Sequence, residues 1–283
     1  MPSNLTIKIG DITTTVEWQS GHCKFSIPQA YRPFVADNPG DLRLELHLGA
    51  PQLELQDKVF DSQPIWSLYQ NRTESVIDIF DQHPDLRRFL VFPQQPCDRA
   101  DLFFTAPAGQ FITPFFGPTM ELLMINYLAR GQGVIIHGCG IELDGQGLLF
   151  AGESGAGKST LANLWQRDKN ATVLSDDRTL VRYIDGEFRM YGTPWHGEAK
   201  FGSPRGVRLA DFFFLKHGTR HSIRKLSAAE SVSRMLQCSF PPYWNAAGMQ
   251  FSLQFFDQLA SGIGCRQLTF RPDESVLQFV NLW

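Results

Sequence analysis

The chain has 283 residues, which predicts either one large domain or two ordinary domains with a sizeable hydrophobic core. It carries 26 Lys and Arg residues against 29 Asp and Glu residues, so its formal net charge is −3. A general nucleic-acid binder or a protein of anionic membrane surfaces needs a surplus of positive charge, so the composition argues against both classes.

The N-terminal segment and the cysteines predict a cytoplasmic protein. The first residues, Met-Pro-Ser-Asn-Leu-Thr-Ile-Lys, lack the apolar stretch of a signal peptide. The uncharged run from Leu102 to Met120 is interrupted by prolines, which argues against a membrane-spanning helix. Reduced thiols are expected in place of disulfides or a zinc site, because the cysteines are odd in number and form no C-x-x-C pair: Cys23, Cys97, Cys139, Cys238 and Cys265.

Residues 1–112 are predicted to form a β-rich domain, whose role the sequence does not indicate. Residues 5–18 form two short alternating segments, separated by the turn-forming pair Gly10-Asp11. Residues 42–48 alternate apolar and polar side chains, as a strand with one solvated face does. Residues 89–92 and 102–105 are further strand candidates.

Residues 113–283 are predicted to form a second domain with a mixed sheet. A helix is expected at 118–130, closed by Gly131. Two hairpins with Asp-Gly turns follow, over residues 134–151 and 179–191. A buried strand is expected at 207–215, and Ser227 with Glu230 predicts a capping box that opens a helix. The C-terminal tail shows no motif.

Between the hairpins, Gly152-Glu-Ser-Gly-Ala-Gly-Lys-Ser159 matches the phosphate-loop pattern G-x-x-x-x-G-K-[ST] in full. An apolar strand precedes it and a helix-forming segment follows it, as the mechanism requires. The glycines allow a tight turn whose N–H groups face phosphate oxygens, and the helix N-terminus adds positive charge. Lys158 is expected to reach the β- and γ-phosphates and Ser159 to bind Mg²⁺. The predicted nucleotide-binding residues are Gly152, Glu153, Ser154, Gly155, Ala156, Gly157, Lys158, Ser159 and Thr160.

Two consecutive acids, Asp176 and Asp177, follow the next apolar strand. One helix and one strand return the chain to the loop, so we expect the acids beside the γ-phosphate. One acid can bind Mg²⁺ while the other accepts a proton from an attacking hydroxyl. His137, on the strand before the loop, is a candidate for orienting this pair. The alternatives are that the acids only form a turn and that His137 is a hydrogen-bonded core residue.

The segment Gly192–Gly197, which contains Trp195 and His196, is either a structural turn or a contact for the nucleotide base or the acceptor. The sequence alone leaves both alternatives open.

Three segments between about residues 117 and 225 resemble the catalytic domain of the HPr kinase/phosphorylase family, which shares its nucleotide core with ATP-dependent phosphoenolpyruvate carboxykinases. They are the His137-Gly138 strand with the loop that follows it, Asp176-Asp177-Arg178, and Pro204-Arg205-Gly206 with the apolar strand after it. The resemblance implies that Asp176 is the general base, helped by His137. It also implies that Asp177 assists at the metal and that Arg205 holds phosphate.

These observations predict an α/β protein, with a mixed-sheet P-loop kinase core and a β-rich N-terminal domain. The expected activity is ATP- and Mg²⁺-dependent transfer of the γ-phosphoryl group to a hydroxyl group, with serine as the first candidate acceptor. The acceptor can be a peptide, a small protein or a small molecule; nucleic acid and membrane are not expected as partners. An ATP sensor without transfer activity and a carboxykinase-like enzyme are the alternatives, and the sequence leaves a homo-oligomer and phosphorylase activity open.

Overall fold

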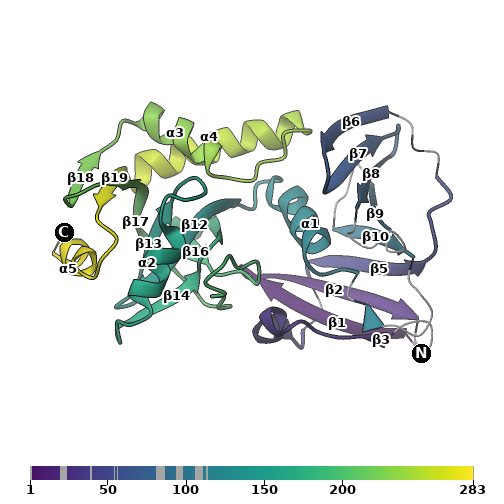
Figure 1. Ribbon diagram of the computed structural model, residues 1–283. Coiled ribbons are helices and arrows are strands. Elements are labelled where there is room, and N and C mark those ends of the chain that lie inside the picture. Colours follow the sequence, from purple (N-terminus) through teal and green to yellow (C-terminus); the bar gives the residue numbers. More distant parts are fainter. Residues whose placement is uncertain are drawn as a thin grey trace. The chain divides into compact units, whose positions relative to one another are not determined.

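The computed structural model divides the chain into two compact units, Met1–Tyr127 and Leu128–Trp283 (Figure 1). The structure describes residues 2–19, 24–38, 40–53, 55, 57–80, 87–93, 98–105, 111–112 and 114–282. Cys23 and Cys97 lie outside these residues. The sequence-based division falls at residue 113, whereas the two units divide between Tyr127 and Leu128, in the last turn of the helix that begins at Pro118. Among the described residues, no helix is long and apolar enough to cross a membrane.

The first unit contains a nine-stranded mixed sheet in the order β4-β1-β2-β5-β10-β9-β8-β7-β6. Strand β5 shows why these residues form a sheet: Leu42, Leu44 and Leu46 are buried, and the polar residues between them face the other side. The pairs β2–β5 and β5–β10 are parallel and the other pairs are antiparallel. The strands of this sheet are β1 (Pro2–Ile9), β2 (Ile12–Gln19), β4 (Val35–Ala36), β5 (Leu42–Leu48), β6 (Asp57–Ser62), β7 (Trp66–Gln70), β8 (Glu74–Ile79), β9 (Arg88–Pro93) and β10 (Arg99–Phe104).

The remaining elements of the first unit are short, apart from one helix. Strands β3 (Lys24–Phe25) and β11 (Phe111–Ile112) form a two-stranded parallel sheet. A 3₁₀ helix spans Gln29–Phe34, and α1 spans Pro118–Leu128. The predicted hairpin at Gly10-Asp11 is confirmed, because both residues have positive φ and Ile9 pairs with Ile12.

The second unit contains a mixed sheet in which the central strands form a closed ring. Strand β12 pairs with β13 and β15, β13 pairs in parallel with β17, and β16 joins β15 to β17. Strand β14 also pairs with β12, and β19 and β18 extend the sheet from β17. The strands are β12 (Val134–Leu143), β13 (Gln146–Ala151), β14 (Ala171–Ser175), β15 (Arg178–Ile184), β16 (Glu187–Tyr191), β17 (Gly206–His217), β18 (Ser222–Lys225) and β19 (Cys265–Phe270).

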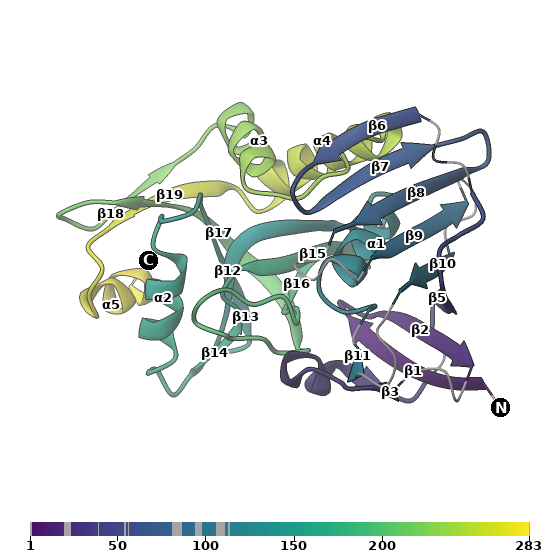
Figure 2. The same cartoon turned by 45° about the vertical axis from the view of Figure 1, so that its right-hand side comes forward.

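Helices pack on both faces of this sheet. Side chains of β12 alternate: Val134 and Ile136 join the core of α3 (Ala228–Gln237) and α4 (Ala246–Gly262). Cys139 and Ile141 join the core of α2 (Lys158–Trp165) and α5 (Ser275–Asn281) on the other face. Figures 1 and 2 both show α3 beside α4 and α2 beside α5. The mixed α/β architecture predicted from the sequence is therefore confirmed.

Candidate functional site

The glycine-rich loop connects the end of β13 to the first residue of α2, Lys158. Gly157 precedes the helix at φ +98°, a backbone conformation that favours glycine. A Cβ there would lie 2.7 Å from Cζ of Phe270 and 3.2 Å from Cε1 of His217, so the loop has no space for a side chain at this position. No side chain caps the start of α2. The first N–H groups of the helix and the positive end of its dipole therefore suit an anion.

Lys158 is buried behind the loop, with 7% of the residue exposed. Its Nζ donates hydrogen bonds to the carbonyl oxygens of Gly152 at 2.8 Å and Glu153 at 2.9 Å. Burial lowers the pKa of Lys158, and the charge of Asp177 partly offsets this effect. Of the other predicted loop residues, Ser159 is half-buried and Thr160 is exposed in the first turn of α2.

The acidic pair and the loop lie on opposite sides of β12. Gly138 of β12 donates its backbone N–H to the carbonyl oxygen of Asp177 at 2.8 Å. The same glycine pairs across the strand with Ala151, the last residue before the loop. Two strands that flank a third are about 10 Å apart. The chain therefore brings Asp177 and the start of the loop to the same level of the sheet.

Asp177 and His137 form the central polar pair of the site. The distance from Nε2 of His137 to Oδ1 of Asp177 is 2.9 Å, and the guanidinium of Arg178 pairs with the other carboxylate oxygen. Burial favours a higher pKa for Asp177, but the hydrogen bond from His137 and the charges of Arg178 and Lys158 lower it overall. Asp177 is therefore ionised at neutral pH. The ring of Phe240 packs against Arg178, 4.8 Å from its Cζ.

Asp176 has a different environment from Asp177. Only 1% of the residue is exposed, and its carboxylate accepts backbone hydrogen bonds from Gly197 at 2.9 Å and Ala199 at 2.8 Å. Asp176 therefore holds the segment that follows β16. The sequence-based interpretation pairs His137 with Asp176, whereas the structure pairs His137 with Asp177. Asp176 and Asp177 lie in the bend between β14 and β15, where the two adjacent side chains have different partners.

The other predicted contacts are Arg205 and the segment that contains Trp195 and His196. Arg205 forms an ion pair with Glu142 at 2.7 Å, at the end of β12 that is next to the Asp144-Gly145 turn. The structure thus does not bring Arg205 to the loop. Trp195 is buried, with 6% exposed, so its ring packs inside the unit, while His196 is exposed.

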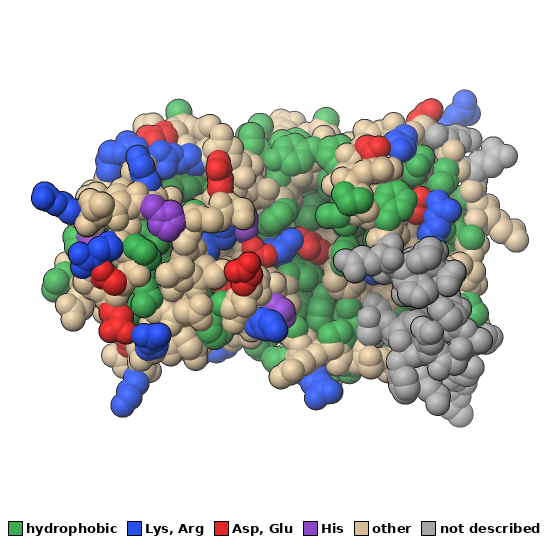
Figure 3. All heavy atoms as spheres, in the orientation of Figure 1, with side chains coloured by type: hydrophobic (Ala, Val, Ile, Leu, Met, Phe, Trp, Pro, Cys, Tyr) green, Lys and Arg blue, Asp and Glu red, His purple; other side chains and the backbone are tan. Residues whose placement is uncertain are grey.

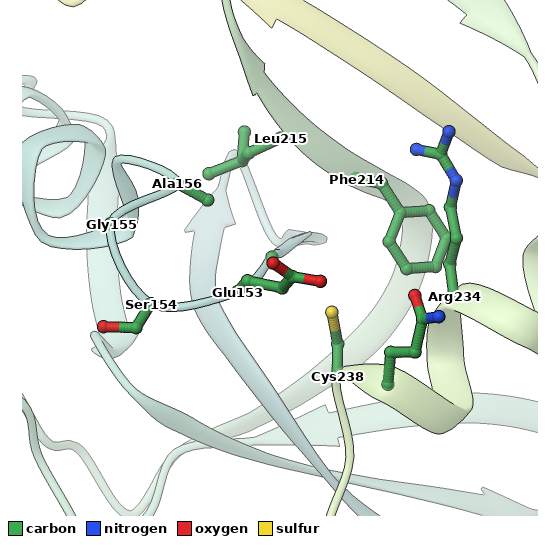
Figure 4. A pocket seen from close by; sticks show the side chains of 10 residues that line it. Glu153, Ser154, Gly155, Ala156, Phe214, Leu215, Arg234 and Cys238 are labelled. Carbon is green, nitrogen blue, oxygen red and sulfur yellow. The ribbon is translucent and has the colours of Figure 1, made fainter.

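A pocket of about 460 Å³ opens on the β17 side of the loop (Figure 4). Figure 4 shows Glu153 and Cys238 pointing toward one another, and the ring of Phe214 next to Arg234. The residues that line it come from the loop, the end of β17 and the end of α3: Gly152, Glu153, Ser154, Gly155, Ala156, Phe214, Leu215, Arg234, Gln237 and Cys238. No sequence motif marks Arg234 or Gln237, because their proximity to the loop depends on how α3 packs.

Fold and site together define a mixed α/β unit with a glycine-rich loop, a buried lysine and a histidine–aspartate pair. Comparison with protein families gives a match to the SynChlorMet cassette protein ScmC over residues 119–255, slightly less than half of the chain. This range includes the loop, His137, both acids and α3. A search of curated proteins finds no match.

The family match corrects the resemblance inferred from the sequence. The matching family is ScmC and not the HPr kinase/phosphorylase family, so that assignment is wrong. The motifs behind it are short, and a phosphate-loop pattern recurs in unrelated families, so it specifies local geometry without specifying the family.

Proposed function

We propose that this protein is an ATP- and Mg²⁺-dependent phosphotransferase, which moves the γ-phosphoryl group to a hydroxyl of a peptide, small protein or small molecule. The observation that carries the proposal is the Asp177–His137 pair, whose Oδ1 and Nε2 are 2.9 Å apart, at the same level of the sheet as the start of the glycine-rich loop. A phosphate cradle next to a carboxylate is the arrangement that hydroxyl phosphorylation needs.

The loop and Lys158 would bind the triphosphate. The N–H groups at the start of α2 would face phosphate oxygens. Nζ of Lys158 would replace its hydrogen bonds to two loop carbonyl oxygens with hydrogen bonds to phosphate. The hydroxyl of Ser159 is a hard oxygen donor of the kind that Mg²⁺ prefers, so this residue fits that ion. Bound Mg²⁺ would neutralise the charge that develops on the transferring group.

Asp177 would accept the proton of the acceptor hydroxyl, with His137 as the positioning residue that fixes its orientation. Asp176 is only 1% exposed and cannot be reached by an acceptor, whereas the side chain of Asp177 is 18% exposed, so Asp177 is the acid that we assign as the base. The proposal therefore differs from the sequence-based expectation, in which Asp176 is the base. A positioned general base contributes about 10²–10⁴-fold to a rate.

The test uses the full chain with γ-labelled ATP, Mg²⁺ and a mixture of host peptides and metabolites, followed by mass spectrometry. The wild type should yield a labelled phosphoproduct, and Lys158→Ala and Asp177→Asn should not. Calorimetric titration should show that Asp177→Asn still binds ATP. A wild type that binds no ATP would exclude the proposal, and Asp177→Asn with wild-type transfer would exclude the assigned base.

A further inference from the structure

We infer that the pocket between the glycine-rich loop, β17 and α3 binds the nucleoside and α-phosphate portion of the nucleoside triphosphate. The inference rests on the proposed function and extends it to residues that no motif assigns. It implies that Arg234 and Gln237 of α3, together with Glu153 of the loop, determine nucleotide affinity.

The order of the strands gives the direction of the bound nucleotide. Strand β13 carries the loop, with β12 and the acidic pair on one side and β17 on the other. In phosphoryl transfer the attacking and leaving oxygens lie roughly in line with the phosphorus. If the acceptor hydroxyl is at Asp177, the leaving diphosphate must point away from it. That direction leads to the β17 side, where the pocket opens.

Arg234 has the geometry of a phosphate ligand. Its hydrogen bonds, to Glu230 at 2.8 Å and to Gln267 at 3.1 Å, both use Nη2. Within the described residues, Nη1 and Nε form no hydrogen bond, so the guanidinium can add a phosphate while Glu230 holds it in place. Lys and Arg side chains gather over α3 and β18 (Figure 3). Arg224 and Arg234 share the single carboxylate of Glu230, which leaves this surface positively charged.

The other lining residues suit a nucleoside. Phe214, Leu215 and Cys238 are each less than 9% exposed and form an apolar base to the pocket. Gln237 is exposed at its rim and offers both donor and acceptor groups to a nucleobase. Glu153 would repel a phosphate, but its carboxylate can accept hydrogen bonds from ribose hydroxyls. The volume of about 460 Å³ is within the range of small-molecule pockets.

The experiment titrates the full chain with three ligands in turn: ATP, ADP and inorganic tripolyphosphate. The variants are Arg234→Gln, Gln237→Ala and Glu153→Ala. The matched control is Arg224→Gln, which alters the same Glu230 network at a residue that does not line the pocket. Thermal unfolding of each variant establishes that it is folded.

The three ligands distinguish contacts to the nucleoside from contacts to the phosphates, because tripolyphosphate lacks the nucleoside. Arg234→Gln should lower the affinity for ATP and for ADP about tenfold. Gln237→Ala should lower the affinity for both nucleotides and leave the affinity for tripolyphosphate unchanged. Glu153→Ala should lower the affinity for ATP, because it removes a ribose contact. It should raise the affinity for tripolyphosphate, because it removes a negative charge. Arg224→Gln should retain wild-type affinity for all three ligands.

Two negative results have different meanings. If the wild type binds ATP and the three pocket variants bind ATP and ADP as the wild type does, the inference is wrong and the nucleoside lies elsewhere. If the folded wild type binds neither ATP nor tripolyphosphate, the proposed function itself fails.

Discussion

Substitution of Asp176 by alanine separates the structural acid of the pair from the proposed catalytic one. The change removes both acceptors of the backbone N–H groups of Gly197 and Ala199, in an environment where the residue is 1% exposed. A hydrogen bond to a charged group contributes about 1.5–3 kcal/mol. We take the lower end for each bond, because water can enter the space left by the side chain, and expect a loss of about 3 kcal/mol. For a unit of this size that corresponds to a fall in Tm of about 6–12 °C.

Calorimetry measures the shift in Tm, and amide hydrogen exchange locates it. The N–H groups of Gly197 and Ala199 should exchange faster in Asp176→Ala and at the wild-type rate in Asp177→Ala, since both N–H groups donate to the carboxylate of Asp176. Wild-type Tm in Asp176→Ala, with both amides still protected, would refute the role that we assign to this carboxylate.

Three further predictions concern Asp177, Gly157 and Arg205. The pKa of folded Asp177 is lowered, so the stability from its ionised form is present above the ordinary aspartate pKa and is lost as the pH falls through the folded pKa. The unfolding free energies of wild type and Asp177→Asn, measured by denaturant titration, should therefore converge on acidification; a constant difference would contradict the pKa direction. Gly157→Ala should cost about 1–2 kcal/mol for the left-handed backbone and more for its contact with Phe270. Gly155→Ala, which has φ +81° and no neighbour within 4 Å of its Cβ, is the control, and equal losses in denaturant titrations would show that Phe270 does not limit the site. Arg205→Ala should bind ATP within about twofold of wild type in calorimetric titrations, and a tenfold loss would place this residue at the nucleotide.

The turns and helix starts were predictable because their chemistry is local. Asp144-Gly145 and Asp185-Gly186 both have the positive φ values that a tight hairpin turn requires. Ser227 caps α3 by accepting a hydrogen bond from the backbone N–H of Glu230 at 3.2 Å. The side chain of Glu230 instead pairs with Arg224 and Arg234, so only half of the predicted capping box forms.

The features that the sequence did not indicate depend on contacts between distant segments. Strand β19 pairs in parallel with β17, although about fifty residues separate Phe212 from its partner Cys265. The different roles of Asp176 and Asp177 depend on which side of the chain faces β12, and two adjacent, identical residues carry no such information. Arg234 lies at the pocket because of how α3 packs, and no motif or residue spacing in the sequence indicates that contact.

Strand β12 sets the register of three other strands, β13, β14 and β15, and the histidine and the loop both depend on it. Deleting one residue of β12 near Gly138 would turn His137 to the opposite face of the sheet. It would also change which residue of β12 pairs with Ala151 of β13. This segment should therefore not tolerate changes in length. The Asp144-Gly145 turn, at the far end of the same strand, is the position where an insertion would leave the distance between acid and loop unaltered.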